Sequence, residues 1–573
     1  MKFLFAVFLV LSLSACETAQ KAEQNDNIVC NPMNLSYRFG LEEPSRREAA
    51  DPSVVWFRDR FFLFVSKSGG YWHSKDLVRW KFIETNQIPT EEYAPTAIAI
   101  GDTLFFLASS NELSTIYKST DPLSGRWEVA VPQLDQPVWD PAFFMDDDQR
   151  LYLYWGCSDE RPLYGVELDY SRNFAFKGRP TELIWANTAE NGWEVPGDYN
   201  TLINQKPWIE GPWVVKAAGK YYLQYAGPGT EYKSYSDGMY VADQPLGPFS
   251  LQASNPYTAH PEGFAAGAGH GCTFQDQHSN WWHIGTVTIS QKHIFERRLA
   301  LHPVLLDEDG ILHSNTAFAD YPITIPQYKV NDFDAFTPNW MLLSYRKKVV
   351  VSSSLDSLTP DRMTDEDIRT YWAAQSGEAG EYAILDLEKP MEVNAIQINF
   401  AEHNTKLLGR QKEKFHRYKL EVSVDGSRWE TVVNKSLTET DLPHDFVVFD
   451  QALMSRYIKL TNLEVPDGNL ALSGLRVFGN AKEAASEQVE LISANRNAAD
   501  LRSISLNWKA ANAADGYVLS YGAKADKLYL HHKVFGDTSL VINSLNVHSN
   551  YWFSIKSFNA SGVSPASIPL RIE

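Results

Sequence analysis

DPSVVWFRDRFFLFVS, residues 51–66, is the stretch that decides the fold. It contains two short apolar runs around the polar turn Arg58-Asp59-Arg60, and the second run is strongly aromatic. An Asp-Pro step precedes the first run. Apolar runs of this length that flank a polar turn are typical of a β-hairpin. The stretch therefore predicts one hairpin, and the architecture depends on whether the same pattern recurs.

The pattern recurs four more times along the chain. The other copies are APTAIAIGDTLFFLASS from residue 94, DPAFFMDDDQRLYLYWG from 140, EGPWVVKAAGKYYLQYAG from 210 and GHGCTFQDQHSNWWHIGTV from 269. A unit of four strands that repeats every ~40–50 residues is typical of a propeller blade. The sequence therefore predicts an all-β protein with a five-bladed β-propeller over residues 35–330. The alternative is a set of unrelated hairpins in a β-sandwich.

Polar residues occupy the start of most copies. In a propeller the first strand of each blade lines the central channel, so equivalent positions converge at its mouth. The residues there are Asp51, Ala94, Asp140, Glu210 (one step earlier in the alignment) and His270. Three carboxylates in one funnel repel and shift one another's pKa values, which is typical of an active site.

Two carboxylates on either side of a bond suit glycoside hydrolysis, in which one acts as an acid and the other as a base. Glu210 lies between Trp208 and Trp213, whose apolar side chains favour its protonated form, so we expect it to be the general acid. Asp51 follows Arg46 and Arg47 and is expected to be the base. An inverting enzyme requires the two carboxyls to lie about 6.5–9.5 Å apart.

The segments ADPSVVW, WDPAFF and IEGPWVVK resemble the three catalytic blocks of family 43 glycoside hydrolases, in the same order. That family consists of five-bladed propellers that invert anomeric configuration. The resemblance implies that Asp51 is the general base, that Asp140 modulates the pKa of the acid and orients it, and that Glu210 is the general acid. It continues in GTEYKSYSDGMYVADQPLGPF, GAGHG and FERRLALHPV.

The same resemblance adds two further site residues. Arg297 resembles the family's channel arginine, although Arg298 could take that place, because alternation along a strand turns only one of them inward. His270 resembles a histidine that helps to hold Ca²⁺ through water molecules, whereas a lone histidine is more often structural. Calcium is the one cofactor that the sequence suggests, because GFAAGAGHG lacks the Lys-Ser/Thr of a phosphate loop.

Tryptophans near the acids could stack on sugar rings. Trp72, Trp139 and Trp208 are candidates for substrate binding, with blade core as the alternative for each. Tyr93 precedes Ala94-Pro95 where the family often has tryptophan, which leaves the sugar open.

The N-terminus MKFLFAVFLVLSLSAC reads as an export signal that ends in a lipobox-like Leu13-Ser14-Ala15-Cys16. We expect residues 1–15 to be removed, Cys16 to be lipidated and residues 16–34 to tether the protein to a lipid bilayer. This predicts a bacterial cell-envelope protein at the outer membrane or cell surface. An ordinary secretory peptide is the alternative.

Two further domains are expected after the repeats. Residues 345–480 resemble a discoidin-type (F5/8 type C-like) β-sandwich, which could bind carbohydrate or serve a structural role. Residues 487–573 resemble a fibronectin type III domain, with Trp508 and Tyr517 in its core and Tyr551 as its tyrosine corner.

Composition narrows the functional classes. The chain has 573 residues and a net charge of −19, without a basic patch, which argues against nucleic acid as a partner. Outside the signal, Cys30, Cys157 and Cys272 are expected to be buried free thiols.

We therefore expect an inverting glycosidase that removes pentose or furanose units from plant or algal polysaccharide or oligosaccharide, of β-xylosidase or α-L-arabinofuranosidase type. β-D-galactofuranosidase and endo-arabinanase activities remain open. The alternative of another class is a non-catalytic carbohydrate-binding surface lipoprotein.

Overall fold

The computed structural model describes residues 27–112 and 114–572, and its regular structure is almost entirely β-strand. Helical structure in those residues is limited to short 3-10 helices: η1 (Pro122–Ser124), η2 (Tyr170–Arg172), η3 (Gly192–Glu194), η4 (Phe333–Phe336) and η5 (Pro360–Met363). No helix in this part of the chain has the length and apolar character needed to cross a membrane. The predicted signal peptide and the lipidation residue Cys16 lie outside the described residues.

Five antiparallel sheets follow one another along the chain, and each contains one copy of the repeat. The first contains β2 (Ser53–Phe57), β3 (Arg60–Phe64), β4 (Gly70–Ser74) and β5 (Lys81–Glu84). The second contains β6 (Thr96–Ile100), β7 (Thr103–Leu107), β8 (Ile116–Ser119) and β9 (Glu128–Val131). The third contains β10 (Ala142–Met145), β11 (Leu151–Trp155), β13 (Leu163–Asp169), β14 (Ala175–Phe176) and β15 (Thr181–Ile184).

The fourth sheet contains β12 (Cys157–Ser158), β16 (Ile209–Ala217), β17 (Lys220–Gly227), β18 (Ser236–Ala242) and β19 (Ser250–Leu251). The fifth contains β20 (Gly269–Gln275), β21 (Trp281–Thr288), β22 (Arg297–Leu306) and β23 (Leu312–Ser314). A short pair of β1 (Ile28–Val29) and β24 (Ile323–Thr324) joins the chain before the first sheet to the chain after the fifth.

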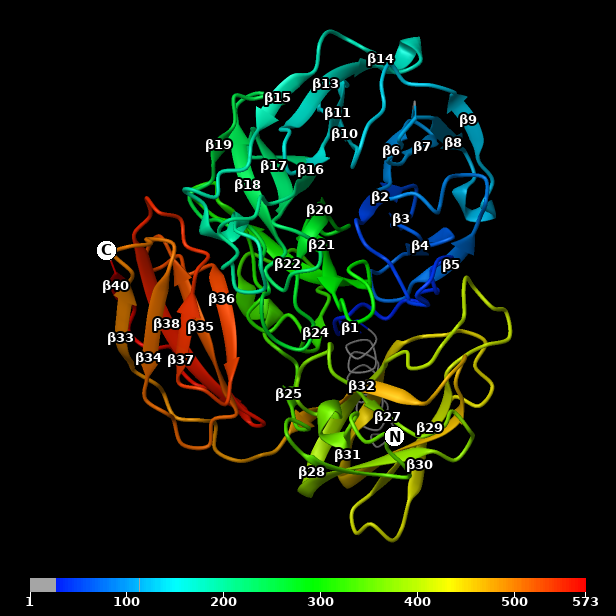
Figure 1. The fold of residues 1–573 in the computed structure, drawn as a ribbon, viewed down its shortest axis with the longest axis vertical. Coiled ribbons are helices and arrows are strands. Elements are labelled where there is room, and N and C mark those ends of the chain that lie inside the picture. The colour runs from blue at the N-terminus through cyan, green and yellow to red at the C-terminus, as the bar shows by residue number, and fades with distance from the viewer. Residues whose placement is uncertain (1–26, 113, 573) are drawn as a thin grey trace, which may run out of the picture.

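These five sheets form a closed ring (Figure 1). Their first strands touch in cyclic order, β2 to β6, β6 to β10, β10 to β16, β16 to β20 and β20 back to β2. Each neighbouring pair of sheets shares an apolar core, including the pair that closes the ring, where Phe61 and Leu63 pack in one cluster with Trp282 and Ile284. Alternation of side chains along each strand supplies the apolar faces that these cores need.

The rest of the chain forms two further β units. An eight-stranded sheet contains β25 (Met341–Leu342), β26 (Lys348–Val351), β27 (Trp372–Ala373), β28 (Tyr382–Phe400), β29 (Arg417–Ser423), β30 (Glu430–Asn434), β31 (His444–Glu464) and β32 (Ala471–Asn480). The last unit has one sheet of β33 (Leu491–Arg496), β34 (Ile504–Trp508) and β37 (Ser539–Ile542). Its other sheet has β35 (Gly516–Gly522), β36 (Leu530–Phe535), β38 (Tyr551–Asn559), β39 (Gly562–Val563) and β40 (Leu570–Ile572).

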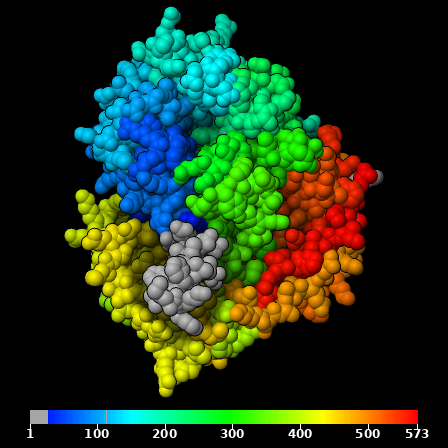
Figure 2. Space-filling view, turned by 180° about the vertical axis from the view of Figure 1, so that it is seen from behind, coloured from blue at the N-terminus to red at the C-terminus, as the bar shows by residue number. Residues whose placement is uncertain are grey.

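Both units pack directly against the ring (Figure 2). The buried Arg47 of the ring forms an ion pair of 2.6 Å with Glu402 of the eight-stranded sheet unit. The last unit contributes the carbonyl of Leu545, which accepts a hydrogen bond of 3.0 Å from the backbone N–H of Gly192. The C-terminal units are therefore fixed to the body that holds the candidate site.

Candidate active site

One residue of each ring sheet adopts a left-handed backbone conformation where the innermost strand begins. These residues are Asp51, Ala94, Asp140, Gly211 and His270, with φ between 40° and 58°. Such a conformation costs a non-glycine residue on the order of 1–3 kcal/mol and is concentrated at functional sites. The fivefold recurrence supports the alignment of the repeats, with Gly211 at the equivalent backbone position and Glu210 one step before it.

Irregular strand pairing changes the direction of two side chains, those of Glu210 and His270. The register between β16 and β17 shifts between Glu210 and Trp213, and the register between β20 and β21 shifts between Gly269 and Cys272. Such β-bulges turn a side chain away from the regular alternation of the strand. A Cβ atom on Gly211 would lie 2.4 Å from Cδ2 of His270, so only glycine fits there. The bulges bring Glu210 and His270 to the same end of the ring.

Three carboxylates surround one nitrogen of His270. Its Nδ1 lies 3.3 Å from Asp51 Oδ1, 3.6 Å from Asp140 Oδ2 and 4.0 Å from Glu210 Oε1. The distance between Asp51 Oδ1 and Glu210 Oε1 therefore has an upper limit of about 7 Å, and that limit reaches only the lower end of the inverting range. Carboxylate oxygens of Asp140 and Glu210 lie within 4.8 Å of each other.

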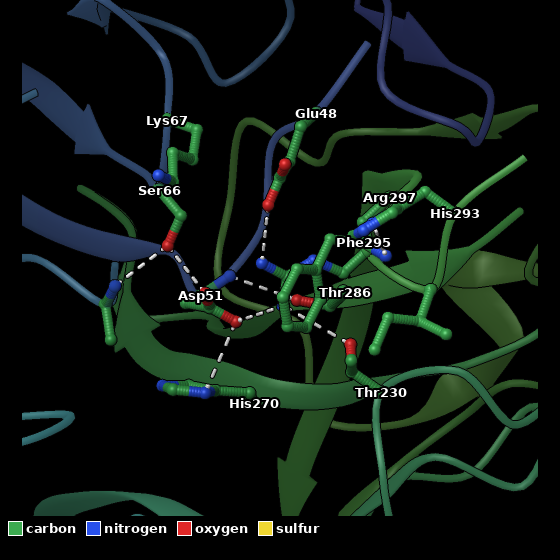
Figure 3. Close-up of polar contacts among 12 residues, drawn as sticks. Glu48, Asp51, Ser66, Lys67, Thr230, His270, Thr286, His293, Phe295 and Arg297 are labelled. Atoms are coloured by element: carbon green, nitrogen blue, oxygen red, sulfur yellow. Dashed lines mark hydrogen bonds and ion pairs between the residues drawn. The ribbon is translucent and has the colours of Figure 1, made fainter. Parts of the chain in front are cut away.

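Asp51 is held as an anion (Figure 3). Arg297 Nη1 donates to its Oδ1 at 3.1 Å, and the Ser66 hydroxyl donates to its Oδ2 at 2.5 Å. Arg297 is itself fixed by Glu48, whose Oε1 accepts from Nη2 at 3.0 Å. Burial alone would raise the pKa of Asp51, but Arg297, His270 and Ser66 outweigh burial and lower it.

Asp140 has the opposite electrostatic environment. Burial raises its pKa to about 7, the negative charges of Glu210 and Asp51 add to the rise, and His270 and the Ser109 hydroxyl oppose it. For His270, burial lowers the pKa, but Asp51, Asp140 and Glu210 outweigh burial and raise it. Near neutral pH the cluster therefore contains a proton-binding aspartic acid beside a histidine that favours its cationic form.

Glu210 accepts hydrogen bonds from two side chains that the sequence did not single out as functional. The hydroxyl of the buried Tyr235 donates to its Oε1, and the thiol of Cys157 donates to its Oε2 at 3.2 Å. Burial raises the pKa of both donors well above their ordinary values, so both keep their protons.

Cys157 corrects the prediction of a buried thiol, since it is half-buried and lines the cavity, whereas Cys30 and Cys272 are buried and free as expected. Its role depends on the pairing of β12 with β16, which places Cys157 opposite Glu210. No sequence signal reveals that register. Tyr235 lies within the segment GTEYKSYSDG, and only the family resemblance connected that segment with the active site.

The acids open into a cavity of about 350 Å³ that is walled by aromatic side chains. Trp139 and Trp208, which are 41% and 47% exposed, line it together with Tyr93 and Phe295. Exposed indole rings beside carboxylates present flat apolar faces to a ligand. These two predicted sugar-binding tryptophans therefore lie in the cavity with the acids.

Trp72 does not reach the cavity, which corrects its assignment as a substrate-binding residue. It is 1% exposed and packs on Phe82 with ring centroids 4.9 Å apart. Its indole N–H donates to Ser36 Oγ at 3.3 Å. A tryptophan in an aromatic strand can either pack in the blade core or stack on a sugar, and its position in the strand does not distinguish the two. Here the Trp72 side chain packs in the core between neighbouring sheets.

Alternation along β22 separates Arg297 from Arg298. Arg297 lines the acid cavity, whereas Arg298 points the other way and its Nε donates to His444 Nε2 at 2.9 Å. Arg297 is therefore the one that contacts Asp51.

The described side chains around His270 do not provide direct calcium ligands in the number that the ion needs, and binding through water molecules stays a prediction. Ca²⁺ takes six to eight oxygen ligands. Among the described residues, the group of side chains close enough to share an ion is Asp140, Cys157 and Glu210, and one of its three donors is a thiol.

Comparison with known proteins identifies the class of two segments. Residues 45–312 match the model of glycosyl hydrolases family 43, and residues 348–473 match that of the F5/8 type C domain. The chain therefore contains a family 43 glycoside hydrolase domain followed by a discoidin-type domain.

Individual relatives are distant. The chain is 29% identical to the β-D-galactofuranosidase of Aspergillus niger, over 35% of this chain and 63% of that protein. It is 24% identical to a non-reducing end α-L-arabinofuranosidase of Bacteroides ovatus, over 50% of this chain and 57% of that protein. The chain thus spans about three fifths of the length of these relatives. One similar solved structure, a thermostable family-43 glycoside hydrolase, shows 21% identity and a TM-score of 0.43, over 52% of this chain and all of that one.

Proposed function

We propose that residues 35–330 form a five-bladed β-propeller enzyme that hydrolyses glycosidic bonds with inversion and releases pentose or furanose units from plant or algal polysaccharide. The observation that supports this most directly is the meeting of Asp51, Asp140 and Glu210, from three different sheets, around His270 Nδ1. The match of residues 45–312 to family 43 points to the same chemistry.

The environments of Asp51 and Glu210 support different roles for the two carboxyls. Asp51, kept ionised by Arg297, takes a proton from water as the water oxygen bonds to the anomeric carbon. Glu210, beside Trp208 in the cavity wall, donates its proton to the glycosidic oxygen as the bond to the anomeric carbon breaks. Asp140 lies beside Glu210, and hydrogen bonds from Tyr235 and Cys157 hold the Glu210 carboxyl in its orientation.

The cavity favours removal of terminal units. A volume of about 350 Å³ is at the lower end for small-molecule pockets and suits one or two sugar rings. An endo-arabinanase would need a groove that accepts a chain on both sides of the bond. The name of the Bacteroides relative, a non-reducing end enzyme, points in the same direction. Among terminal activities, β-xylosidase and α-L-arabinofuranosidase lead, and β-D-galactofuranosidase is the second candidate because of the Aspergillus relative.

We also propose that Cys16 anchors the protein to a bacterial envelope membrane, and that residues 487–573 form a fibronectin type III domain. The two sheets of the last unit support the second assignment. So does Tyr551, whose hydroxyl accepts a hydrogen bond of 2.9 Å from the backbone N–H of Asn546, as a tyrosine corner does.

Replacement of the acid tests the function. Glu210→Gln should lower kcat on an unactivated oligosaccharide by ~10³-fold, because the amide has no acidic proton to donate to the leaving oxygen. Sugar binding, measured by calorimetry, should persist. Proton NMR of the wild-type reaction should show the inverted anomer first.

Glu182→Gln, an exposed change on β15, is the matched control and should leave turnover unchanged. Wild-type rates for Glu210→Gln would refute the assignment of the acid. Binding without hydrolysis by the wild-type protein would favour the non-catalytic carbohydrate-binding alternative.

A further inference from the structure

A second cavity, of about 830 Å³, lies between the ring and the eight-stranded sheet. Its walls come from the segment 36–39 and Arg47 before β2, from Glu84 at the end of β5, and from the loops 407–417 and 439–441. Six cationic side chains line it: Arg38, Arg47, Arg410, Lys412, Lys414 and Arg417. The protein as a whole carries a charge of −19, so this gathering of cations is unlike its average surface.

Most of the arginines in this cleft already have carboxylate partners. Arg47 binds Asp441 at 2.6 Å, Arg417 binds Glu464 at 2.7 Å, and Arg38 binds Glu91. Glu84, Glu413 and Glu439 also line the cleft, but none of them is within ion-pair distance of Arg410.

Arg410 is the exception. Its Nη1 donates to the Ser36 carbonyl at 2.6 Å, while its Nε and Nη2 are buried without a hydrogen-bond partner among the described residues. Three other described arginines have a buried nitrogen without a partner, and each of them pairs with a carboxylate: Arg46 with Glu48, Arg297 with Asp51 and Glu48, and Arg369 with Asp198. A buried cation without a counter-ion is strongly unfavourable.

Aromatic packing holds Arg410 in place but does not satisfy its donors. The guanidinium lies 3.6 Å from the centroid of Phe82, an arrangement that stabilises by about 0.5–2 kcal/mol. Burial, together with the positive charges of Arg38 and Arg47, lowers the pKa of Arg410 to about 9. An anion beside it would remove that penalty.

We propose that this cleft binds an oxyanion carried by a saccharide, either the carboxylate of a uronic acid or a sulfate group, at Arg410. The guanidinium lines the cleft and carries a positive charge that an oxyanion held there would neutralise. Lys412 and Lys414 are exposed, form no ion pair with a described residue and add positive charge at the cleft. The volume of about 830 Å³ exceeds what a lone ion needs. The saccharide part of this proposal rests on the proposed function.

Contacts connect the cleft to the acid cavity. Arg38 Nε donates to the Lys67 carbonyl at 3.0 Å, and the Lys67 ammonium lies 4.5 Å from the ring centroid of Tyr93. Tyr93 lines the acid cavity. Arg38 of the cleft and Tyr93 of the acid cavity are thus linked through one residue, Lys67.

Calorimetry on the full-length Glu210→Gln variant tests the proposal with three probes: a xylo-oligosaccharide bearing glucuronic acid, the neutral xylo-oligosaccharide of the same length and a sulfated xylo-oligosaccharide. We expect at least one acidic probe to bind ten or more times more tightly than the neutral one, and the difference to shrink in high salt. The acidic probe that binds more tightly than the neutral one identifies the ligand group as carboxylate or sulfate. Equal affinity for all three probes would overturn the proposal.

Arg410→Gln, added to the same background, should abolish the preference for the acidic probe. The pair Lys412→Gln and Lys414→Gln changes only exposed side chains and should weaken the preference at least threefold even if Arg410→Gln fails to fold. Lys406 is exposed nearby but lies outside the cleft, so Lys406→Gln should leave the preference for the acidic probe unchanged. An unchanged preference in a folded Arg410→Gln protein, or in the double lysine variant, would overturn the proposal. Hydrolysis of aryl glycosides by protein with intact Glu210 reports on the proposed function separately.

Discussion

The contrast between Asp51 and Asp140 lies in what each carboxylate touches. Both are buried and both face His270, yet Arg297 contacts only Asp51. Arg297, together with His270 and Ser66, reverses the effect of burial on Asp51, because an opposite charge within hydrogen-bond distance favours the ionised form. Two aspartates from equivalent positions therefore have opposite preferences for a proton.

The raised pKa of Asp140 makes stability depend on pH. The carboxyl binds its proton more tightly in the folded state, with a pKa of about 7 against 3.8 for the free group. Its contribution is fully present below about pH 4 and is lost as the pH rises through 7. Between pH 5 and pH 8 the wild-type free energy of unfolding should fall by about 2–3 kcal/mol more than that of Asp140→Asn. Urea denaturation at each pH measures the difference, and parallel curves would contradict the prediction.

Tyr235 gives a second prediction for a single side chain. Tyr235→Phe removes the hydrogen bond to Glu210 Oε1 and leaves only the weak thiol donor of Cys157. Because a misplaced catalytic group costs up to ~10²-fold, kcat should fall by about 10- to 100-fold with little change in KM. Tyr257→Phe removes a buried hydroxyl bonded to Thr273 instead, and should lower stability without lowering kcat. Equal kcat values for the two variants would show that Tyr235 does not position the acid.

Among elements, the entry into β16 decides whether the acid reaches the cavity. Gly211 has a φ of 58°, lies in the irregular pairing after Glu210 and faces His270. Gly211→Ala would place a methyl group 2.4 Å from His270 Cδ2, so the ring or the strand must move. We expect kcat to fall by about 100-fold.

Gly219→Ala is the matched control for this element. Gly219 also has a positive φ, 77°, at the turn between β16 and β17, but no atom lies within 4 Å of the added Cβ. It should destabilise the protein by about 1 kcal/mol and leave kcat unchanged. If both variants lose activity equally, backbone strain rather than contact with His270 is responsible.

The strands also show which features of the fold and the site could be predicted from the sequence. The hairpin period predicted the repeat, and with it the residues at the start of each innermost strand, because chain geometry places equivalent positions together. The prediction that Trp72 binds substrate and the prediction that Cys157 is a buried thiol were wrong for the same physical reason. Which face of a strand lies inward, and which residue pairs across to the next sheet, depends on packing and register that no local pattern records. Tyr235 is separated from Glu210 by the whole of β17, so only the folded sheet brings them together.

In the whole molecule, the eight-stranded sheet unit supports the acid cavity. Ile368 packs with Phe264 and Val287 of the ring. The neighbouring Arg369 donates from Nη1 to Asp198 Oδ2 at 2.9 Å and from Nη2 to the Glu231 carbonyl at 3.0 Å. Glu231 lines the acid cavity next to Thr230, whose hydroxyl accepts from Arg297 at 3.3 Å. A loop of the eight-stranded sheet unit thus braces the segment that contacts the channel arginine.

This brace predicts that the discoidin-type unit affects substrate binding without touching substrate. Arg369→Ala should free the segment around Thr230 and Glu231 and raise KM about tenfold, a loss of about 1.4 kcal/mol, with a smaller effect on kcat. Arg428→Ala, an exposed arginine of the same unit, should change neither constant. Steady-state kinetics with oligosaccharides of increasing length measures both. If Arg369→Ala behaves like Arg428→Ala, the ring alone shapes the cavity and the C-terminal unit only packs against it.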